Sequence, residues 1–368
     1  MEKIAPTSLA QSWDNVGLLA GDRNARVRRM LLTIDVTAAV VDEAIRERVD
    51  LLLAYHPPIF QAIKSLVASG RVGTGMEALV FRCIRDGVGI YATHTALDAA
   101  DGGTNDVIAG LCGVERTEPL EYVDDPKVDE CKLVVFVPPE QLDRVATAMF
   151  NAGAGHIGDY SHCSYRTAGE GTFLGGESTK PAVGRRGRLE VVSEVRLESI
   201  VGAKDLPAVV RAMREAHPYE EPAFDIYSLQ GRPVKGIGRM GRLPRRVTLG
   251  ELARNLERAT RAAGVQIVGR PNHRVEKAVI VVGAAGSLPL RLGLGPDDVI
   301  ITGEIRHHDA LTMGRIGCAA IALGHWASER PVLDSLARRL ESLLPGVQIS
   351  ISRQDRDPFQ PAGRVRGS

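Results

Sequence analysis

An apolar run that stops at two prolines is the feature that most constrains the fold of this chain. Residues 49–54 (VDLLLA) predict a buried strand, and Tyr55-His56-Pro57-Pro58 follow it directly. Because proline removes a ladder hydrogen bond and is rarely accepted inside a sheet, the strand must end near His56. In open α/β sheets, ligands bind beyond the carboxyl ends of the strands. His56 is therefore placed where a binding site is expected.

The segments around this strand alternate between strand and helix patterns. Such a βαβ rhythm with apolar strands predicts an α/β domain with a mainly parallel sheet and flanking helices. The pattern pauses after residue 121 and resumes from Gly236 onward. The predicted strands of this domain are 29–35, 50–54, 87–91, 277–282, 298–302, 318–323 and 347–351, and the predicted helices are 38–48, 75–86, 249–263 and 327–344.

A different order of elements lies between the two α/β segments. Residues 125–235 are patterned as strand, helix, strand, strand, helix and strand, which is the split βαβ order of ferredoxin-like domains. We therefore predict one α/β domain formed by residues 1–124 and 236–368, interrupted by an inserted ferredoxin-like domain at 125–235. Three consecutive domains are the alternative, and they would separate the two ends of the site described below.

The composition limits which binding partners and which cellular compartment we expect for the protein. The formal net charge of +1 gives no electrostatic reason to expect nucleic acid or a membrane as the main partner. The five cysteines form no CxxC pair, which is typical of free thiols in a reducing compartment. No apolar run reaches the ~18 residues of a membrane span, and the first residues lack a signal-peptide pattern. We expect a cytoplasmic protein.

Histidines and acids recur just past the predicted strands. His325 and Glu329 are four residues apart at the start of a helix, so they share one face and can reach one ion. Imidazole together with carboxylate favours Zn, Mn or Fe over Ca. Each residue alone also fits a structural or surface role, and it is their recurrence that predicts a metal site. The strand-end candidates are His56, His94, His307, His308 and His325, five of the nine histidines, with the acids Asp98 and Glu329.

Two glycine-rich segments have the spelling of phosphate-binding loops. Residues 236–241 match GxGxxG, but Leu243 and Pro244 follow where a helix should open, so we interpret the segment as the return to the main domain. Residues 283–287 follow a strand and could bring backbone N–H groups to an anion. A plain tight turn is the favoured interpretation there. No residues that bind an organic cofactor are predicted.

Several motifs, in order along the chain, resemble the Nif-three-like family. Its members are named dinuclear metal centre hexameric proteins or GTP cyclohydrolase I type 2 homologues. The resemblance spans nearly the whole chain, and residues 216–225 (AHPYEEPAFD) are similar to the extra PII/CutA-like domain of longer members. The motifs that carry it are 12–18 (SWDNVGL), 32–37 (LTIDVT), 55–60 (YHPPIF), 93–98 (THTALD), 102–106 (GGTND) and 324–329 (GHWASE).

The resemblance implies a centre of one or two divalent metal ions per subunit, with Zn, Fe or Mn as the candidates. The matching ligand positions are His56, Asp98, His325 and Glu329. The first histidine of the family's histidine pair is Tyr55 here, a weaker fifth ligand candidate because a free phenol has a pKa of ~10. The resemblance further implies a homo-hexamer whose metal sites face an inner cavity.

We hypothesise a metal-dependent hydrolase similar to GTP cyclohydrolase, in which metal-activated water attacks a nucleotide or a phosphoester. Asp98 and His56 would hold one metal, His325 the other, and Glu329 would bridge. The catalytic candidates for proton transfer are His94, His307 and His308. The alternative is a non-catalytic metal-binding or regulatory hexameric assembly whose inserted domain mediates contacts. A third hypothesis, a ring that threads nucleic acid, is disfavoured by the near-zero net charge.

Overall fold

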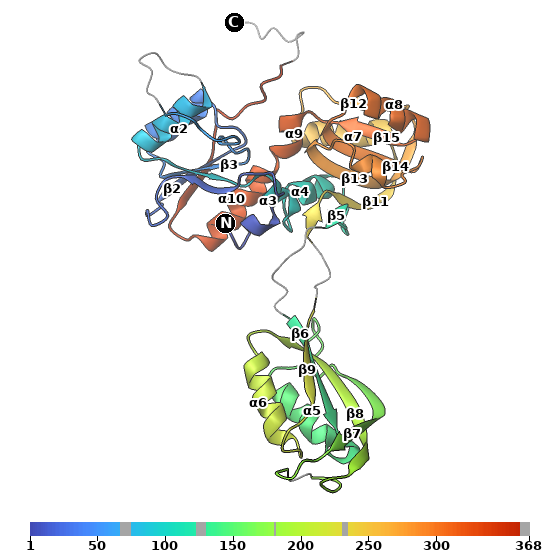
Figure 1. Cartoon of the computed structure of the whole chain (residues 1–368). Helices are drawn as coiled ribbons and strands as arrows, with labels where there is room; N and C mark the ends of the chain where they lie inside the picture. The colour runs from blue at the N-terminus through green and yellow to red at the C-terminus, as the bar shows by residue number, and fades with distance from the viewer. Residues whose placement is uncertain (67–74, 123–129, 180–181, 230–234, 361–368) are drawn as a thin grey trace, which may run out of the picture. The chain divides into compact units, whose positions relative to one another are not determined.

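The computed structural model describes residues 1–66, 75–122, 130–179, 182–229 and 235–360, which form two compact units (Figure 1). Unit 1 comprises Met1–Asp125 and Pro233–Ser368, and unit 2 comprises Pro126–Arg232. The predicted boundary between residues 124 and 125 lies outside the described residues. In the described part of the chain, none of the helices has the length and apolarity needed to cross a bilayer.

The first sheet of unit 1 has five strands in the order β1-β4-β3-β2-β16. Strands β2, β3 and β4 are parallel neighbours, as the βαβ rhythm predicted, and β16 adds in parallel from the other end of the sequence. In Figure 1, the late helix α10 accordingly lies beside the early strand β2. The elements are η1 (Thr7–Leu9), β1 (Gly17–Ala20), β2 (Arg29–Thr33), α1 (Ala38–Arg46), β3 (Leu51–Ala54), α2 (Met76–Arg85), β4 (Gly89–Ala92), α3 (His94–Ala99), α4 (Thr104–Leu111), α10 (Val332–Leu343) and β16 (Gln348–Ile351).

Both faces of this sheet are covered by helices. Successive residues of a strand point to opposite faces, and Leu31 and Leu52 pack into a cluster with α1 and α2. Their neighbours Leu32 and Leu53 pack instead into a cluster with α3 and α10. Continuous apolar strands such as Leu51–Ala54 are therefore required by the architecture, because neither face of the sheet can be polar.

The second sheet of unit 1 has the order β11-β13-β14-β15-β12. Strands β13, β14 and β15 are parallel, and the two outer strands are antiparallel to their neighbours. A buried cluster joins the sheet to α7 and α4. The elements are β11 (Arg239–Thr248), α7 (Leu249–Thr260), β12 (Gln266–Val268), β13 (Arg274–Ala284), η3 (Pro289–Arg291), β14 (Asp298–Glu304), α8 (His307–Ile316), β15 (Ala319–Ala322) and α9 (His325–Glu329), with a two-stranded pair of β5 (Glu121–Tyr122) and β10 (Gly236–Ile237).

The GxGxxG segment forms β10 and the start of β11, in agreement with its interpretation as a return to the main domain. Its arginine, Arg239, is buried and donates hydrogen bonds of 2.6 and 2.8 Å to the carboxylate of Asp106 on α4. The same guanidinium donates to the carbonyl oxygens of Gly236, Gly238 and Ala100. These bonds tie β10 and β11 to the helices beside the first sheet.

The single helix predicted over residues 327–344 is wrong. The chain forms α9 (His325–Glu329) and, after a break, α10 (Val332–Leu343). Pro331 lies at the break, and a proline inside a helix lacks the backbone donor and clashes with the preceding turn. The break leaves α9 as a short element of its own, which carries two predicted site residues.

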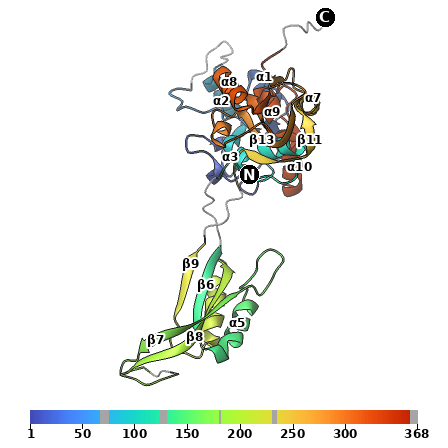
Figure 2. The same ribbon diagram turned by 90° about the vertical axis from the view of Figure 1, so that its right-hand side faces the viewer.

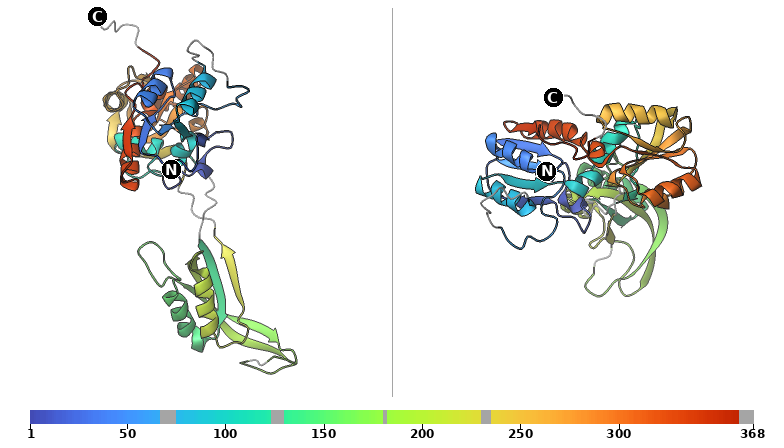
Figure 3. Two further views of the ribbon diagram at one scale, coloured as in Figure 1. Left: turned by 90° about the vertical axis from the view of Figure 1, so that its left-hand side faces the viewer. Right: turned by 90° about the horizontal axis from the view of Figure 1, so that it is seen from above.

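Unit 2 is a four-stranded antiparallel sheet in the order β7-β8-β6-β9. Its two helices contact each other and pack on one face of the sheet (Figures 2 and 3). The core residues alternate along β6 with residues of the opposite face, which the helices leave uncovered. The elements are β6 (Glu130–Val137), η2 (Pro139–Gln141), α5 (Leu142–Asn151), β7 (Tyr165–Leu174), β8 (Leu189–Gly202), α6 (Leu206–Ala216) and β9 (Phe224–Ser228).

Candidate metal centre

Three predicted ligands converge in unit 1, where the carboxyl ends of strands from its two sheets meet. His56 follows β3 of the first sheet, whereas His325 and Glu329 lie on α9, which follows β15 of the second. Their ligand atoms all lie within 4.8 Å of one another. Glu329 stands between the imidazoles, with Oε2 3.3 Å from His56 Nε2 and Oε1 3.1 Å from His325 Nε2. This is a donor set that suits a transition metal.

Each of these two histidines is oriented by a second carboxylate. Asp35 Oδ1 lies 2.9 Å from His56 Nδ1, and Glu304 Oε1 lies 3.0 Å from His325 Nδ1. A carboxylate at one ring nitrogen fixes the ring orientation and leaves the other nitrogen toward the site, as in metal centres of proteins. The sequence interpretation missed both acids, although each lies at or just past the end of a strand, β2 or β14.

Two glycines allow α9 to approach the second sheet closely. A side chain at Gly283, whose φ is +61°, would overlap the carboxylate of Glu329, and one at Gly303 would overlap Ser328. Ser328 Oγ accepts the N–H of Gly283 at 2.9 Å and donates to the carbonyl of His325 at 2.8 Å. The segment 283–287 thus seats the helix, and the N–H of Gly283 is already used, which agrees with the tight-turn interpretation.

The buried carboxylate of Glu329 is stabilised by positive charge on its neighbours. Burial alone would raise the pKa of Glu329, but the adjacent His325 and His56 outweigh it and hold the pKa below its usual value. Burial would lower the pKa of His56, but Asp35 and Glu329 overcome it and raise the pKa to about 10. The hydrogen bond to Glu329 likewise raises the pKa of His325. A metal cation can take the place of these protons.

A further observation on Glu329 supports a metal ion at this cluster. Among the described residues, the buried Oε2 atom of Glu329 has no hydrogen-bond partner, even though His56 lies nearby. An unsatisfied buried carboxylate oxygen is costly unless it is paired or coordinates an ion. The cluster of His56, His325 and Glu329 therefore offers a buried carboxylate oxygen that an ion could bind.

Tyr55 and Asp98 form a separate pair beside the cluster. The buried Tyr55 hydroxyl donates a hydrogen bond of 2.6 Å to Asp98 Oδ1. Burial, followed by the charge of Asp98, raises the pKa of Tyr55 well above its ordinary value, which disfavours the phenolate. Burial also raises the pKa of Asp98 to about 6, against the opposing effect of the Tyr55 hydroxyl. Asp98 lies outside the close cluster of ligand atoms but lines the same cavity.

His94 also lies beside the cluster, and its backbone is strained. Its φ of +28° is rare for a residue with a side chain, and such strain is often found at functional positions. The ring centroid lies 5.4 Å from that of His56, and Nδ1 lies 2.8 Å from Asp14 Oδ1. The side chain of Asp14 is buried and also accepts the N–H of Thr95 at 3.1 Å. The sequence interpretation missed this aspartate.

His307 and His308 lie elsewhere. Both are exposed at the start of α8, with their rings 5.5 Å apart. Neither belongs to the described residues that line the cavity at the cluster. Their position after β14 matched that of the other candidates, but the cluster is approached by Glu304, which precedes them.

The cavity at the cluster has a volume of about 420 Å³. Trp13 lines it and forms an edge-on pair with Phe60 at 6.0 Å and with His94 at 5.9 Å. Trp13 is 58% exposed and Phe60 53% exposed, so this aromatic pair is open to solvent beside the candidate metal centre. The lining also includes Gln11, Thr95, Glu121, Ile237, Leu288 and the residues 281–285.

The fold and the cluster define an α/β protein with a candidate divalent-metal centre between two sheets. The sequence profile of the family described as Duf34/NIF3 (NGG1p interacting factor 3) matches residues 1–358. The chain belongs to this family. A Bacillus subtilis protein named GTP cyclohydrolase 1 type 2 homolog is 37% identical over 97% of this chain and 95% of its own length. A Mycobacterium tuberculosis protein of the same name is 39% identical over 93% of this chain and 89% of its own.

Solved structures agree with the family assignment. The crystal structure of a Bacillus cereus protein related to NIF3 is 34% identical, with a TM-score of 0.68 over 97% of this chain and 96% of that one. A Staphylococcus aureus protein of known structure is 26% identical, with a TM-score of 0.71 over 98% of this chain. The likeness extends over both units of the chain.

Proposed function

We propose that His56, His325 and Glu329 form a divalent metal centre and that the protein is a metal-dependent hydrolase acting on a nucleotide, in line with the name of its relatives. The observation that carries the proposal is Glu329, which is buried between two imidazoles and has an unused oxygen. The carboxylates at the far nitrogens of both rings add support, because histidines that bind a metal almost always donate their other ring N–H to such a partner.

Four residues would hold one or two ions of Zn, Fe or Mn. His56 and Asp98 would serve one position, His325 the other, and Glu329 would bridge them, which its contacts with both histidines support. A divalent metal bound there would lower the pKa of water from ~15.7 toward ~7 and so would supply hydroxide at neutral pH. Tyr55 would keep Asp98 in place as a neutral hydrogen-bond donor rather than as a ligand.

His94 is the proton carrier that the geometry favours. Its ring lies beside His56 and lines the cavity together with His325 and Glu329, and Asp14 at Nδ1 leaves Nε2 for exchange with a bound substrate or water. Asp14 would stabilise the protonated ring when His94 accepts a proton. His307 and His308 are less favoured for this role, because they lie outside the cavity lining that is described.

The aromatic pair of Trp13 and Phe60 favours a substrate with a planar ring. An aromatic face that is more than half exposed beside a reactive centre offers a stacking surface, and base stacking of this kind contributes ~1–3 kcal/mol. A purine resting there would be close to both His94 and the cluster. The pair thus supports a nucleotide over a bare phosphoester as the substrate class.

The test combines metal analysis with turnover. We expect purified protein to carry at least one Zn, Fe or Mn per chain and to hydrolyse GTP, with activity lost on chelation and restored by metal. His325→Ala and Glu329→Gln should lose stoichiometric metal, whereas His308→Ala, an exposed histidine outside the cavity lining, should keep it. Unchanged metal content in His325→Ala and Glu329→Gln would refute the ligand assignment.

The same experiment separates the catalytic proposal from its alternative. Full metal occupancy without turnover of any nucleotide would favour a non-catalytic metal-binding or regulatory assembly. We further propose that unit 2 is an inserted ferredoxin-like domain, which its four antiparallel strands with both helices on one face support. A homo-hexamer is the proposed assembly, and sedimentation analysis of the full chain tests it.

A further inference from the structure

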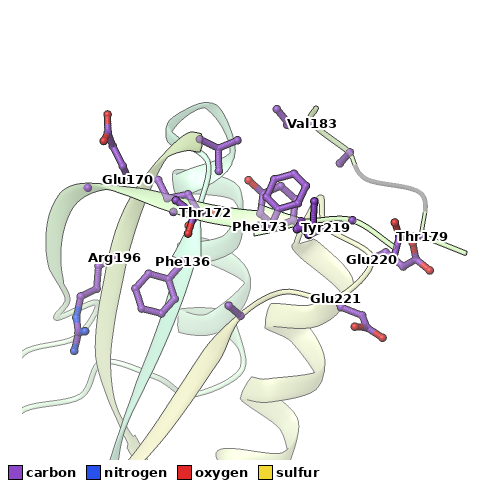
Figure 4. A pocket seen from close by; sticks show the side chains of 18 of the residues that line it. Phe136, Glu170, Thr172, Phe173, Thr179, Val183, Arg196, Tyr219, Glu220 and Glu221 are labelled. Atoms are coloured by element: carbon purple, nitrogen blue, oxygen red, sulfur yellow. The ribbon is translucent and has the colours of Figure 1, made fainter. Parts of the chain in front are cut away.

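Unit 2 contains a cavity of about 750 Å³ that the proposed hydrolase chemistry does not use (Figure 4). Its floor is the face of the sheet opposite the helices, because Phe136, Glu194 and Arg196 alternate with the buried core residues of β6 and β8. A volume of this size falls within the range of ~300–1,000 Å³ that is usual for small-molecule sites. Further lining comes from β7 and from the segment after α6.

A buried histidine holds two aromatic walls of the cavity together. His217 accepts the backbone N–H of Tyr219 through Nδ1 at 3.1 Å, and its Nε2 donates to the carbonyl of Phe136 at 3.0 Å. Both bonds require the neutral ring with its proton on Nε2, and burial, the largest influence, lowers the pKa of His217. Phe136, Tyr219 and, from β7, Phe173 all line the cavity.

Glycines on β7 open the cavity and position one carboxylate. Glu194 pairs in register with Gly169, and its side chain reaches diagonally across Gly171, where an added Cβ would overlap the carboxylate. An added Cβ at Gly169 would instead meet no atom within 4 Å. Gly169 therefore borders open space within the cavity, and Gly171 allows Glu194 to lie along its floor.

The described lining of the cavity contains more acidic than basic residues. Four carboxylates line it, and the one cation of the described lining, Arg196, is held by Glu198 at 2.6 Å. The guanidinium of Arg196 already lies 5.9 Å from the centre of the Phe136 ring, so the floor accepts a cation against an aromatic face. Burial, followed by the charge of the nearby Glu194, raises the pKa of Tyr219 to about 12, so its buried hydroxyl stays neutral, and its oxygen can accept a further hydrogen bond. The lining carboxylates are Glu170, Glu194, Glu220 and Glu221.

We propose that this cavity binds an organic ammonium ion with an apolar body about the size of an aromatic ring. Glu194 pairs with the ammonium group, and the Tyr219 oxygen accepts one of its N–H bonds. Phe136 and Phe173 contact the apolar body. A neutral or anionic ligand of the same shape lacks a charged partner for Glu194 and binds more weakly.

Calorimetric titration of the full chain tests the proposal with two probes that differ only in their head group. 2-Phenylethylamine carries the ammonium, and 2-phenylethanol carries a hydroxyl in its place. We expect the amine to bind at least roughly tenfold more tightly than the alcohol. Equal binding of the two probes, or no binding of the amine at millimolar concentration, would overturn the proposal.

Three variants locate the binding. Glu194→Gln should weaken amine binding by roughly tenfold and leave the alcohol unchanged, because it removes the charge alone. Gly169→Val should abolish binding of both probes, since it fills open space on a strand where valine is favoured. Glu215→Gln, an exposed residue of α6 outside the lining, is the charge-matched control and should bind like wild type. Amine binding that survives both cavity variants would place the ligand elsewhere.

Discussion

Replacing Tyr55 by phenylalanine isolates the hydrogen bond that ties Asp98 beside the candidate metal centre. Tyr55 is buried and Asp98 is half-buried, and the hydroxyl donates at 2.6 Å to the carboxylate. The substitution removes one oxygen and preserves the ring, so the hydrophobic contacts of Tyr55 remain. We expect metal-free Tyr55→Phe protein to lose stability, and to lose more of it at high pH than at low pH.

The magnitude follows from the charge of Asp98. Burial raises its pKa from 3.8 to about 6, so the folded protein holds a carboxylate at pH 8 and a carboxylic acid at pH 5. A hydrogen bond to a charged group contributes ~1.5–3 kcal/mol, and one to a neutral group ~0.5–1.5 kcal/mol. The free energy of unfolding should therefore fall by about 2 kcal/mol at pH 8 and by about 1 kcal/mol at pH 5.

The sign agrees with proton linkage. When the pKa of an acid is higher in the folded than in the unfolded state, ionisation of the acid lowers the free energy of unfolding. This loss begins as the pH exceeds the pKa of the unfolded state, and it stops growing once the pH has passed the pKa of the folded state. Loss of the Tyr55 hydroxyl removes an interaction that lowers the pKa of Asp98, so that pKa moves further upward. The difference in free energy of unfolding between the wild type and Tyr55→Phe must therefore grow between pH 5 and pH 8.

Urea unfolding followed by tryptophan fluorescence measures this effect in unit 1 alone, because both tryptophans, Trp13 and Trp326, lie there. Tyr91→Phe is the control, since Tyr91 lies on the adjacent β4 and its hydroxyl has no hydrogen-bond partner among the described residues. An equal loss of stability at both pH values, or a loss no larger than that of Tyr91→Phe, would refute the reasoning.

Three further predictions follow from the same region. Tyr55→His supplies an imidazole beside Asp98 and should raise the metal content by up to one ion per chain; elemental analysis that finds the wild-type content would show that Tyr55 does not limit the second ion. Because the pKa values of His56 and His325 are raised, Zn²⁺ should displace about one to two protons at pH 7 and should bind more tightly as the pH rises. Calorimetry in buffers of different ionisation enthalpy measures the proton release, and binding without proton release would contradict the prediction. Arg239→Met leaves Asp106 without its buried partner and should lower the free energy of unfolding by ~3–5 kcal/mol in urea, and a change below 1 kcal/mol would argue against that ion pair.

The placement of each cluster residue just past the end of a strand could be predicted from local sequence signals. Pro57 and Pro58 end β3, and parallel strands present their carboxyl ends at the same edge of a sheet. His56 and His325 therefore had to lie at such edges, and the four-residue spacing placed Glu329 beside His325 on α9. The break at Pro331 was also readable, because a helix interior excludes proline.

The outer carboxylates could not be predicted in the same way. Asp35, Glu304 and Asp14 reach their histidines across 21, 21 and 80 residues of sequence, so their pairing depends on strand order and register. The division of unit 1 into two sheets is equally non-local, because β16 returns to pair with β2. Periodicity reports which residues are buried, but it does not report which strands are neighbours.

The two proposed metal positions, at Glu329 and at Asp98, should differ in their affinity for metal. At the cluster of His56, His325 and Glu329, the buried Oε2 atom of Glu329 makes no hydrogen bond and faces His56 at 3.3 Å, so an ion there gains a ligand atom. On the side of Asp98, an ion must compete with the Tyr55 hydroxyl and with the proton that a pKa of about 6 retains in mild acid. The first ion should therefore bind at Glu329, and the second should bind more weakly and with a stronger dependence on pH. The hydrogen bond from the Tyr55 hydroxyl to Asp98 is the contact that produces this asymmetry.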